Sequence, residues 1–260
     1  MRERFYGLIV ATGAWLALLP AIAAQTARPQ VIPNLSGVWD NTHIDVRKGG
    51  PSEGPPGGFF GPGDIPLFGF TKEEPAMWPA AAEKYKRART GVVRGPWDRG
   101  IGELDPANSC FPHGAIRLYT IPRPWELRQL PEMALFLYEA DHWVRRAYLD
   151  GRGHPEGYPI TWMGHSIGKY TGDTLVVDTV GMSEKTWLDT MGHPHSDALH
   201  VVERFRRLDR DTLQIDLTFD DPQTYTKPWI GKKIFKLAPR GFDILEEVLC
   251  EEWLEMGKKR

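Results

Sequence analysis

Histidine is the residue type whose placement in this chain points most clearly to chemistry. Of the eight histidines, six lie within residues 142–200. Four of these six occupy segments rich in glycine and proline, which predict loops at strand ends: His154, His165, His193 and His195. Loops of this kind often carry catalytic groups, and an imidazole with a pKa of about 6.5 transfers protons near neutral pH. We expect His165 and His195 to be proton-transfer groups.

A glutamate shares the apolar face of a predicted strand. Residues 199–207 alternate so that Glu203 lies on one side with three apolar residues. A carboxylate there is expected to be buried, which raises its pKa, whereas a nearby guanidinium lowers it. Two interpretations stay open. Glu203 is either an acid or base inside a cavity, or part of a structural ion pair with Arg145 or Arg146.

Residues 150–154, Asp-Gly-Arg-Gly-His, follow a predicted strand. Asp150 and the glycine after it are typical of a hairpin turn. A turn requires neither Arg152 nor His154, so we expect both at a barrel mouth. Arg152 would hold an anionic group, and His154 would join the catalytic side chains. Asp150 or Asp189 is expected to orient a histidine.

Aromatic residues flank the same segments. Tyr158, Trp162 and Trp187 are expected to form an aromatic wall beside a ligand, and His193 is a further candidate for substrate binding. Such walls suit glycan, terpenoid or phenolic ligands, and the sequence does not choose among them.

The pair His193-Pro-His195 supports a rival hypothesis, a divalent-metal site. On extended backbone both imidazoles lie on one side, and His200, His165 or Glu203 would complete a shell for zinc, iron or copper. The spacing departs from the cupin pattern, in which a glutamate follows the histidine pair after three or four residues. The leading hypothesis predicts no cofactor; the rival one predicts a metal on His193, His195 and His200.

The elements that must position these residues are β-strands. Residues 212–219 alternate strictly between polar and apolar, as half-buried antiparallel strands do. Further candidate strands cover residues 125–130, 133–140, 142–149, 165–171, 174–180, 199–207, 230–237 and 243–250. Short breaks predict hairpins, and eight or nine strands in meander order predict an all-β fold closed into an antiparallel barrel without edges.

The remaining elements precede the barrel. Residues 80–89 are rich in helix formers, and residues 71–74 resemble a capping box. Residues 49–66 hold seven glycines and five prolines among several apolar residues, which predicts a flap packed over the body. We expect three parts along the chain: a signal peptide (1–24), a lead-in with flap and helix (25–104) and a barrel domain (105–260).

The first residues follow the plan of a secretory signal peptide. Arg2 and Arg4 precede an apolar run over residues 7–19 and then small residues that suit cleavage. The alternative is a retained membrane anchor. We expect a periplasmic or secreted protein without membrane contact after cleavage. In an oxidising compartment the only two cysteines, Cys110 and Cys250, are expected to form a disulfide, the alternative being two buried thiols.

Composition limits the function classes. The net charge of −2 argues against a nucleic-acid binder, and the 41% hydrophobic content argues against a disordered chain. The chain has neither a P-loop nor a G-x-G-x-x-G motif, so no nucleotide cofactor is expected.

Several stretches of the sequence resemble motifs of known protein families. Gly37-Val-Trp39 resembles the G-x-W signature of lipocalin-like barrels. Residues 105–253 resemble a family of exported bacterial proteins, mostly of unassigned function. The matching motifs include DGRGHP at 150–155, GHSIG at 164–168, GDTLVVDT at 172–179 and HPHSDALHVVER at 193–204. The resemblance implies export and a lipocalin-like β-barrel, and it implies no particular activity.

The leading hypothesis is an exported, cofactor-independent lyase, isomerase or hydrolase. It would act on a small organic molecule at one barrel mouth, with His165 and His195 moving protons and Glu203 as the buried acid or base. The alternatives are a periplasmic carrier of a hydrophobic ligand and a histidine-ligated metalloenzyme. The sequence leaves the oligomeric state open.

Overall fold

The structure is a computed structural model of the 260-residue chain. It describes residues 32–40, 60–61, 65–89 and 105–244, which all belong to one compact unit, Val31–Arg260. The predicted signal peptide, most of the predicted flap and Cys250 lie outside the described residues. The expected bridge between Cys110 and Cys250 therefore stays a prediction.

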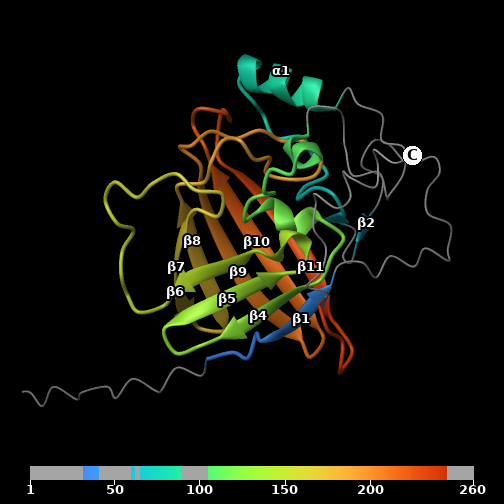
Figure 1. Ribbon diagram of the computed structural model, residues 1–260, viewed down its shortest axis with the longest axis vertical. Helices are drawn as coiled ribbons and strands as arrows, with labels where there is room; N and C mark the ends of the chain where they lie inside the picture. Colours follow the sequence, from blue (N-terminus) through green and yellow to red (C-terminus); the bar gives the residue numbers. More distant parts are fainter. Residues whose placement is uncertain (1–31, 41–59, 62–64, 90–104, 245–260) are drawn as a thin grey trace, which may run out of the picture. The chain divides into compact units, whose positions relative to one another are not determined.

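Nine strands close into a barrel, which confirms the predicted all-β barrel fold (Figure 1). Their order around the barrel is β1-β11-β10-β9-β8-β7-β6-β5-β4. The strands are β1 (Gly37–Asp40), β4 (Trp125–Gln129), β5 (Met133–Tyr138), β6 (Val144–Tyr148), β7 (His165–Thr171), β8 (Thr174–Val180), β9 (His200–Asp209), β10 (Thr212–Asp220) and β11 (Trp229–Leu237). The short strand β1 closes the barrel, because it pairs with β11 on one side and with β4 on the other.

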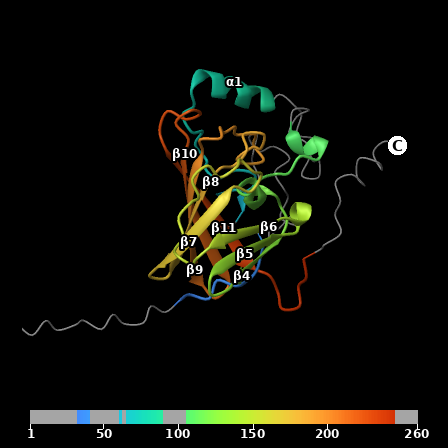
Figure 2. The same cartoon turned by 60° about the vertical axis from the view of Figure 1, so that its left-hand side comes forward.

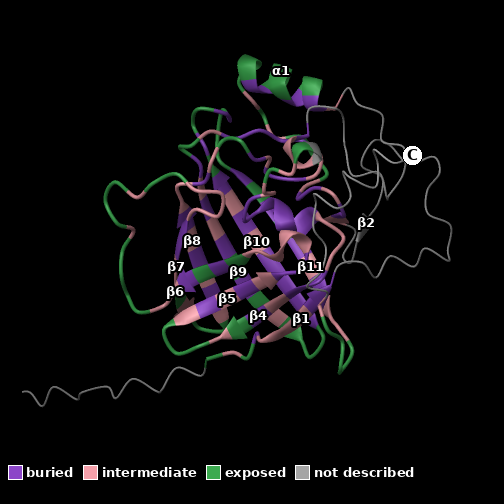
Figure 3. Cartoon of the chain, viewed as in Figure 1, coloured by how far each residue is buried: buried purple, intermediate pink, exposed green. Residues whose placement is uncertain are grey.

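The interior of the barrel is a packed aromatic core. The 3₁₀ turn η4 (Arg117–Thr120) places Tyr119 there, fully buried. The ring of Tyr119 lies 5.4–6.4 Å, edge-on, from rings on four strands: Trp125, Tyr138, Phe205 and Phe235. Edge-to-face packing of this kind stabilises aromatic cores beyond the burial of apolar area. Figure 3 shows the buried residues running along the strands around this core.

The alternation of strand β9 is confirmed. The side chains of Val201, Glu203 and Phe205 are fully buried, while Arg204 and Arg206 are exposed. Strand β10 differs slightly from the strict prediction, because Thr212 and Gln214 are also buried beside its apolar residues.

One pair of strands departs from the predicted antiparallel meander. Strands β6 and β7 run parallel and pair only at Ala147 with Ser166 and at Tyr148 with Ile167. A parallel pair needs a crossover connection rather than a hairpin, and residues 149–164 form that connection. Every other pair in the barrel is antiparallel.

Two further predictions lie partly outside the described residues. The last predicted strand, 243–250, does not form over the part described, since Asp243 and Ile244 belong to no strand. The predicted flap contains regular structure at its end, where β2 (Phe60–Gly61) pairs with β3 (Ile65–Pro66). Leu67, just after β3, is buried against the body, as the flap prediction requires.

The predicted helix is confirmed as α1 (Pro79–Ala88), which lies over one end of the barrel in both views (Figures 1 and 2). The predicted capping box is wrong, because the residue that caps the helix is Trp78, and its side chain makes no capping hydrogen bond. Pro79 begins the helix instead, which suits its fixed φ and missing N–H. The Thr71 hydroxyl accepts a hydrogen bond only from the Glu73 N–H, within a local turn.

In the part of the chain that the structure describes, no helix combines the length and the apolar character needed to cross a bilayer.

Candidate functional site

A pocket of about 290 Å³ lies where strands β6 and β7 separate. Its wall is formed by the outward face of β6 and by residues 158–166. The lining residues include Trp143, Tyr148, Tyr158, Trp162, His165 and Ser166. The pocket therefore gathers three of the predicted site residues, Tyr158, Trp162 and His165, into one aromatic cavity.

The pocket exists because the crossover connection is held away from β6. The Thr161 N–H donates to the Gly181 carbonyl at 3.0 Å, and the Ser183 N–H donates to the Thr161 carbonyl at 2.9 Å. Gly164 then has a φ of +67°, and a β-carbon there would lie 2.6 Å from the Val180 carbonyl oxygen. Only glycine allows this close approach, which delivers His165 to the start of β7.

His165 is the histidine of this pocket, with 5% of its surface exposed. Its ring is stacked on Tyr148 at 5.5 Å and lies 4.7 Å from the ring of Tyr158. Burial lowers the pKa of His165, and the nearby His154 and Arg152 lower it further. The imidazole is therefore neutral at neutral pH, which is the form that accepts a proton.

A second histidine and a carboxylate fix the tautomer of His165. His154 Nε2 lies 3.2 Å from Asp178 Oδ1, and a carboxylate only accepts, so this nitrogen carries hydrogen. The two Nδ1 atoms lie 2.8 Å apart, so one donates to the other; with the His154 hydrogen on Nε2, His165 Nδ1–H is the donor. His165 Nε2 is left with a lone pair and makes no hydrogen bond within the described residues.

Asp178 is held by another histidine. His200 Nε2 donates to Asp178 Oδ1 at 2.7 Å, and this hydrogen bond raises the pKa of His200. Burial would raise the pKa of Asp178, but the hydrogen bonds from His200 and His154 outweigh it and lower that pKa. The carboxylate therefore stays ionised. The sequence analysis missed Asp178, although the register pairs it with Val202, two residues from His200 on the same outer face.

The loop at residues 150–154 is built around an exposed ion pair. Arg152 Nε donates to both carboxylate oxygens of Asp150, at 2.9 and 2.8 Å, and the guanidinium lies 4.0 Å over the ring of Tyr148. Asp150 thus binds Arg152, and Asp178 is the carboxylate that contacts His154.

Glu203 lies inside the barrel rather than in the pocket, in the ion pair that was the alternative interpretation. Arg145 Nη1 donates to Glu203 Oε1 at 2.9 Å, Arg145 Nη2 binds the other oxygen, and the Tyr119 hydroxyl donates to Oε1 at 2.9 Å. Arg145 also donates to Ser166 Oγ at 3.0 Å and to Thr179 Oγ1 at 2.7 Å. Although burial opposes it, the Glu203 carboxylate raises the pKa of Arg145. Because Arg145 and Ser166 line the pocket, this pair supports its inner wall.

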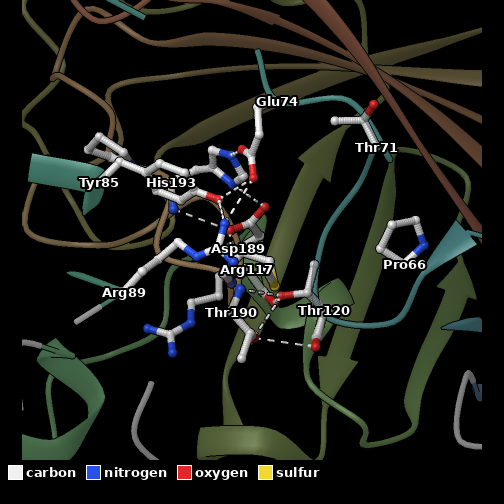
Figure 4. A network of polar contacts seen from close by, with 12 residues as sticks. Pro66, Thr71, Glu74, Tyr85, Arg89, Arg117, Thr120, Asp189, Thr190 and His193 are labelled. Atoms are coloured by element: carbon white, nitrogen blue, oxygen red, sulfur yellow. Dashed lines mark hydrogen bonds and ion pairs between the residues drawn. The ribbon is translucent and has the colours of Figure 1, made fainter. Parts of the chain in front are cut away.

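His193 belongs to a different network, drawn in Figure 4. His193 Nδ1 donates to Asp189 Oδ2 at 2.7 Å, and Nε2 donates to Glu74 Oε2 at 2.8 Å. The ring is stacked on Tyr85 of α1 at 4.3 Å. Burial lowers the pKa of His193, but the two carboxylates outweigh burial and raise it to about 9. Asp189 therefore orients a histidine, as predicted, in a contact that holds α1 in place.

His195 and Trp187 also lie outside the pocket lining. His195 Nδ1 donates to the Ser196 carbonyl at 3.0 Å, and Nε2 accepts from the Thr186 hydroxyl at 2.7 Å. Burial lowers the pKa of His195, so the neutral ring suits both bonds. Trp187 packs against the Arg117 guanidinium at 5.0 Å. The predicted site residues thus divide into a pocket group around His165 and separate networks around His193, His195 and Glu203.

The metal hypothesis requires the imidazoles of His193 and His195 to point to the same side of the backbone, toward one ion. Each imidazole instead directs both nitrogens to its own protein partners. Within the described residues, no group of three histidine, cysteine, aspartate or glutamate side chains is arranged to hold a metal ion.

No family model, curated protein or solved structure matches the chain. The resemblance carried by the motifs therefore stays a prediction, and the argument about function rests on the geometry of the pocket.

Proposed function

We propose that the chain is an exported, cofactor-independent enzyme in which His165 is the general base. One observation carries this proposal. His165 lines a pocket, is nearly buried, has Nδ1 tied to His154 and Asp178, and has Nε2 without a hydrogen bond in the described residues. General-base catalysis needs a neutral nitrogen that is oriented and accessible, and this arrangement supplies one.

The hydrogen-bonded chain His165–His154–Asp178, here called the relay, has a defined part in the reaction. The lone pair of His165 Nε2 takes a proton from the substrate, or from a water that attacks the substrate, and the electron pair of the broken bond stays on the atom that lost the proton. The imidazolium keeps its Nδ1–H bond to His154, which the Asp178 carboxylate stabilises. The proton then passes to the leaving group or to another substrate atom, and His165 returns to its neutral form. Lyase, isomerase and hydrolase chemistry all use this cycle.

The packed interior supports an enzyme over a carrier. A carrier of the lipocalin type binds its ligand inside the barrel. Here Tyr119 and the rings around it, with the Arg145–Glu203 pair, occupy that interior. The pocket that we assign to the substrate lies outside it, at the β6–β7 separation.

Export rests on the N-terminal sequence alone. If residues 1–24 are a signal peptide, expression in a bacterial host with an export pathway yields a periplasmic protein shortened at its N-terminus, as read by mass spectrometry. A full-length protein in the membrane fraction would contradict this part of the proposal.

The activity is tested with three panels of small compounds: esters, carbonyl compounds with an acidic C–H, and compounds with a leaving group β to a carbonyl. Turnover is followed by NMR. We expect the parent protein to turn over at least one class, and His165→Ala to lose about 10²–10⁴-fold of that rate. Lys169→Gln, an exposed position on the same face of β7, is the matched control and should keep the parent rate.

Two results would overturn the assignment. The first is His165→Ala turning over the same substrate at the parent rate. The second is a parent protein that turns over none of the three classes although it binds their members.

A further inference from the structure

The chemistry around the pocket indicates which molecules it takes. Its lining is aromatic on several sides, with Trp143, Trp162 and Tyr158 among the lining residues. Large apolar side chains also stay exposed at its edge: Val144, which lines it, is 43% exposed, and Ile160 is 48% exposed. The exposed Phe111 ring lies 5.6 Å from Trp162. Exposed apolar groups gathered at a cavity mark a binding site for an apolar surface, here a ring that fits between aromatic walls.

The charge of the lining has one sign. Among the described residues, the lining includes two arginines, Arg145 and Arg146, and no aspartate or glutamate. The charge of Arg145 is neutralised by Glu203 from inside the barrel. Arg146 is exposed on the outer face of β6, and its side chain has neither ion pair nor hydrogen bond in the described part of the chain. The pocket thus offers one unneutralised cation.

Arg152, which the sequence suggested as the anion-binding residue, is already engaged. Its guanidinium is paired with Asp150 and packed on Tyr148. An incoming anion would have to displace the Asp150 carboxylate from it. Arg146 has no such competitor and is therefore the better anchor.

The register places this anchor beside the proposed base. Strands β6 and β7 run parallel with Ala147 next to Ser166, so Arg146 is level with His165. Ala147 and Ser166 are buried, so the positions before them, Arg146 and His165, share the outer face. An anion held by Arg146 would therefore lie on the same outer face of the sheet as His165.

We infer that the pocket binds a planar hydrophobic carboxylate, an aromatic or cyclic carboxylic acid in its ionised form, with Arg146 as the anchor for the carboxylate. The planar guanidinium pairs with a carboxylate through two parallel hydrogen bonds, which a neutral amide does not reproduce. The ring lies between the aromatic walls. This inference rests on the proposed function, because it treats the pocket of His165 as the substrate site.

Calorimetric titration of the full chain with three probes tests it: 2-naphthoate, its neutral amide 2-naphthamide, and acetate. The experiment uses low ionic strength at pH 7.5, because salt screens an exposed ion pair. We expect naphthoate to bind at least 10-fold more tightly than naphthamide, and acetate not to bind at the same concentrations. Arg146→Gln should weaken naphthoate at least 10-fold and change naphthamide less than 2-fold.

Two variants make the outcome specific. Arg204→Gln, an exposed arginine on the outer face of β9, is the matched control and should bind naphthoate as the parent does. Lys169→Gln, at an exposed position on β7 outside the pocket lining, is a second control and should also bind naphthoate as the parent does.

Equal affinity for naphthoate and naphthamide, no binding of naphthoate, or unchanged binding in Arg146→Gln would each overturn the inference. None of these results bears on the proton-transfer role, which the rate of His165→Ala decides separately. Conversely, an active His165→Ala that still binds naphthoate through Arg146 would overturn the proposed function and leave the anion site in place.

Discussion

Two histidines in this barrel have nearly the same burial and opposite chemical states. His193 is 4% exposed and His165 is 5% exposed. His193 donates from both nitrogens to carboxylates, and its pKa is raised to about 9. His165 has one nitrogen hydrogen-bonded to a neighbouring histidine and the other without a partner among the described residues, and burial lowers its pKa.

The difference lies in what faces each nitrogen. Two carboxylates keep His193 charged at neutral pH, where it joins α1 to the loop before β9 and has no lone pair for a reaction. Burial and the nearby His154 and Arg152 keep His165 neutral, and the Asp178 carboxylate acts on its tautomer through His154. Burial alone therefore does not mark a catalytic histidine; a free nitrogen with a fixed tautomer does.

The largest expected difference between His193 and His165 is in the free energy of unfolding that is lost when each is replaced by alanine. His193→Ala removes a buried cation and leaves the Asp189 carboxylate buried without its partner. We expect the free energy of unfolding to fall by about 3 kcal/mol, as when buried ion pairs are broken on one side. Chemical denaturation measures this, with His165→Ala as the comparison. A smaller loss for His193→Ala than for His165→Ala would contradict the structural role of His193.

The next effect concerns the relay. In Asp178→Asn the amide can donate to His154 Nε2, which allows the other tautomer and places hydrogen on His165 Nε2. We expect a loss of about 10–100-fold in turnover of whichever substrate the parent accepts, with little change in its KM. Asp150→Asn, in the loop that carries His154 but paired with Arg152, should change the rate less than 3-fold. Equal rates in Asp178→Asn and the parent would remove Asp178 from the mechanism.

The pH dependence has opposite signs for the two histidines. The pKa of His193 is raised in the folded state, so its contribution to stability is full below about 6.5 and is lost as pH rises through about 9. The pKa of His165 is lowered, so its contribution is present above about 6.5 and is lost as pH falls through the folded pKa.

The clean measurement is the stability difference between parent and His193→Ala at several pH values. Taking the difference removes the common background of other groups, such as Lys233, whose pKa burial lowers to about 7. The groups that face His193 are Asp189, Glu74 and Tyr85, and all remain in the variant. We expect the difference to shrink above about pH 9, and a difference that stays constant to pH 10 would contradict a charged His193.

The smallest effect is expected at Glu74. Its side chain is 52% exposed, so solvent screens its interaction with His193 and with Arg89. Glu74→Gln should cost less than about 1 kcal/mol of stability, whereas Asp189→Asn should cost more, because Asp189 is fully buried. The reverse order in denaturation experiments would show that Glu74, rather than Asp189, contributes more to stability through its contact with His193.

Local pattern predicted most of the barrel and some of the site. Alternation located the strands and predicted that Glu203 is buried, and glycine and proline predicted the loop position of His154. His165 was also predicted in a loop, whereas it begins strand β7. Alternation does not encode the direction of pairing, so the parallel β6–β7 pair, and with it the pocket, was not predictable. The other partners are non-local as well. Glu74 is 119 residues from His193, and no sequence spacing brings them together.

The central claim is that His165 is neutral with a bare Nε2, and ¹⁵N NMR of the histidine rings tests it most directly. At pH 7 we expect His165 to show hydrogen on Nδ1 and a lone pair on Nε2, with a titration below 6.5. In the same spectra His193 should carry hydrogen on both nitrogens until the pH approaches about 9. Hydrogen on His165 Nε2 at pH 7, or a His165 charged at that pH, would contradict the account.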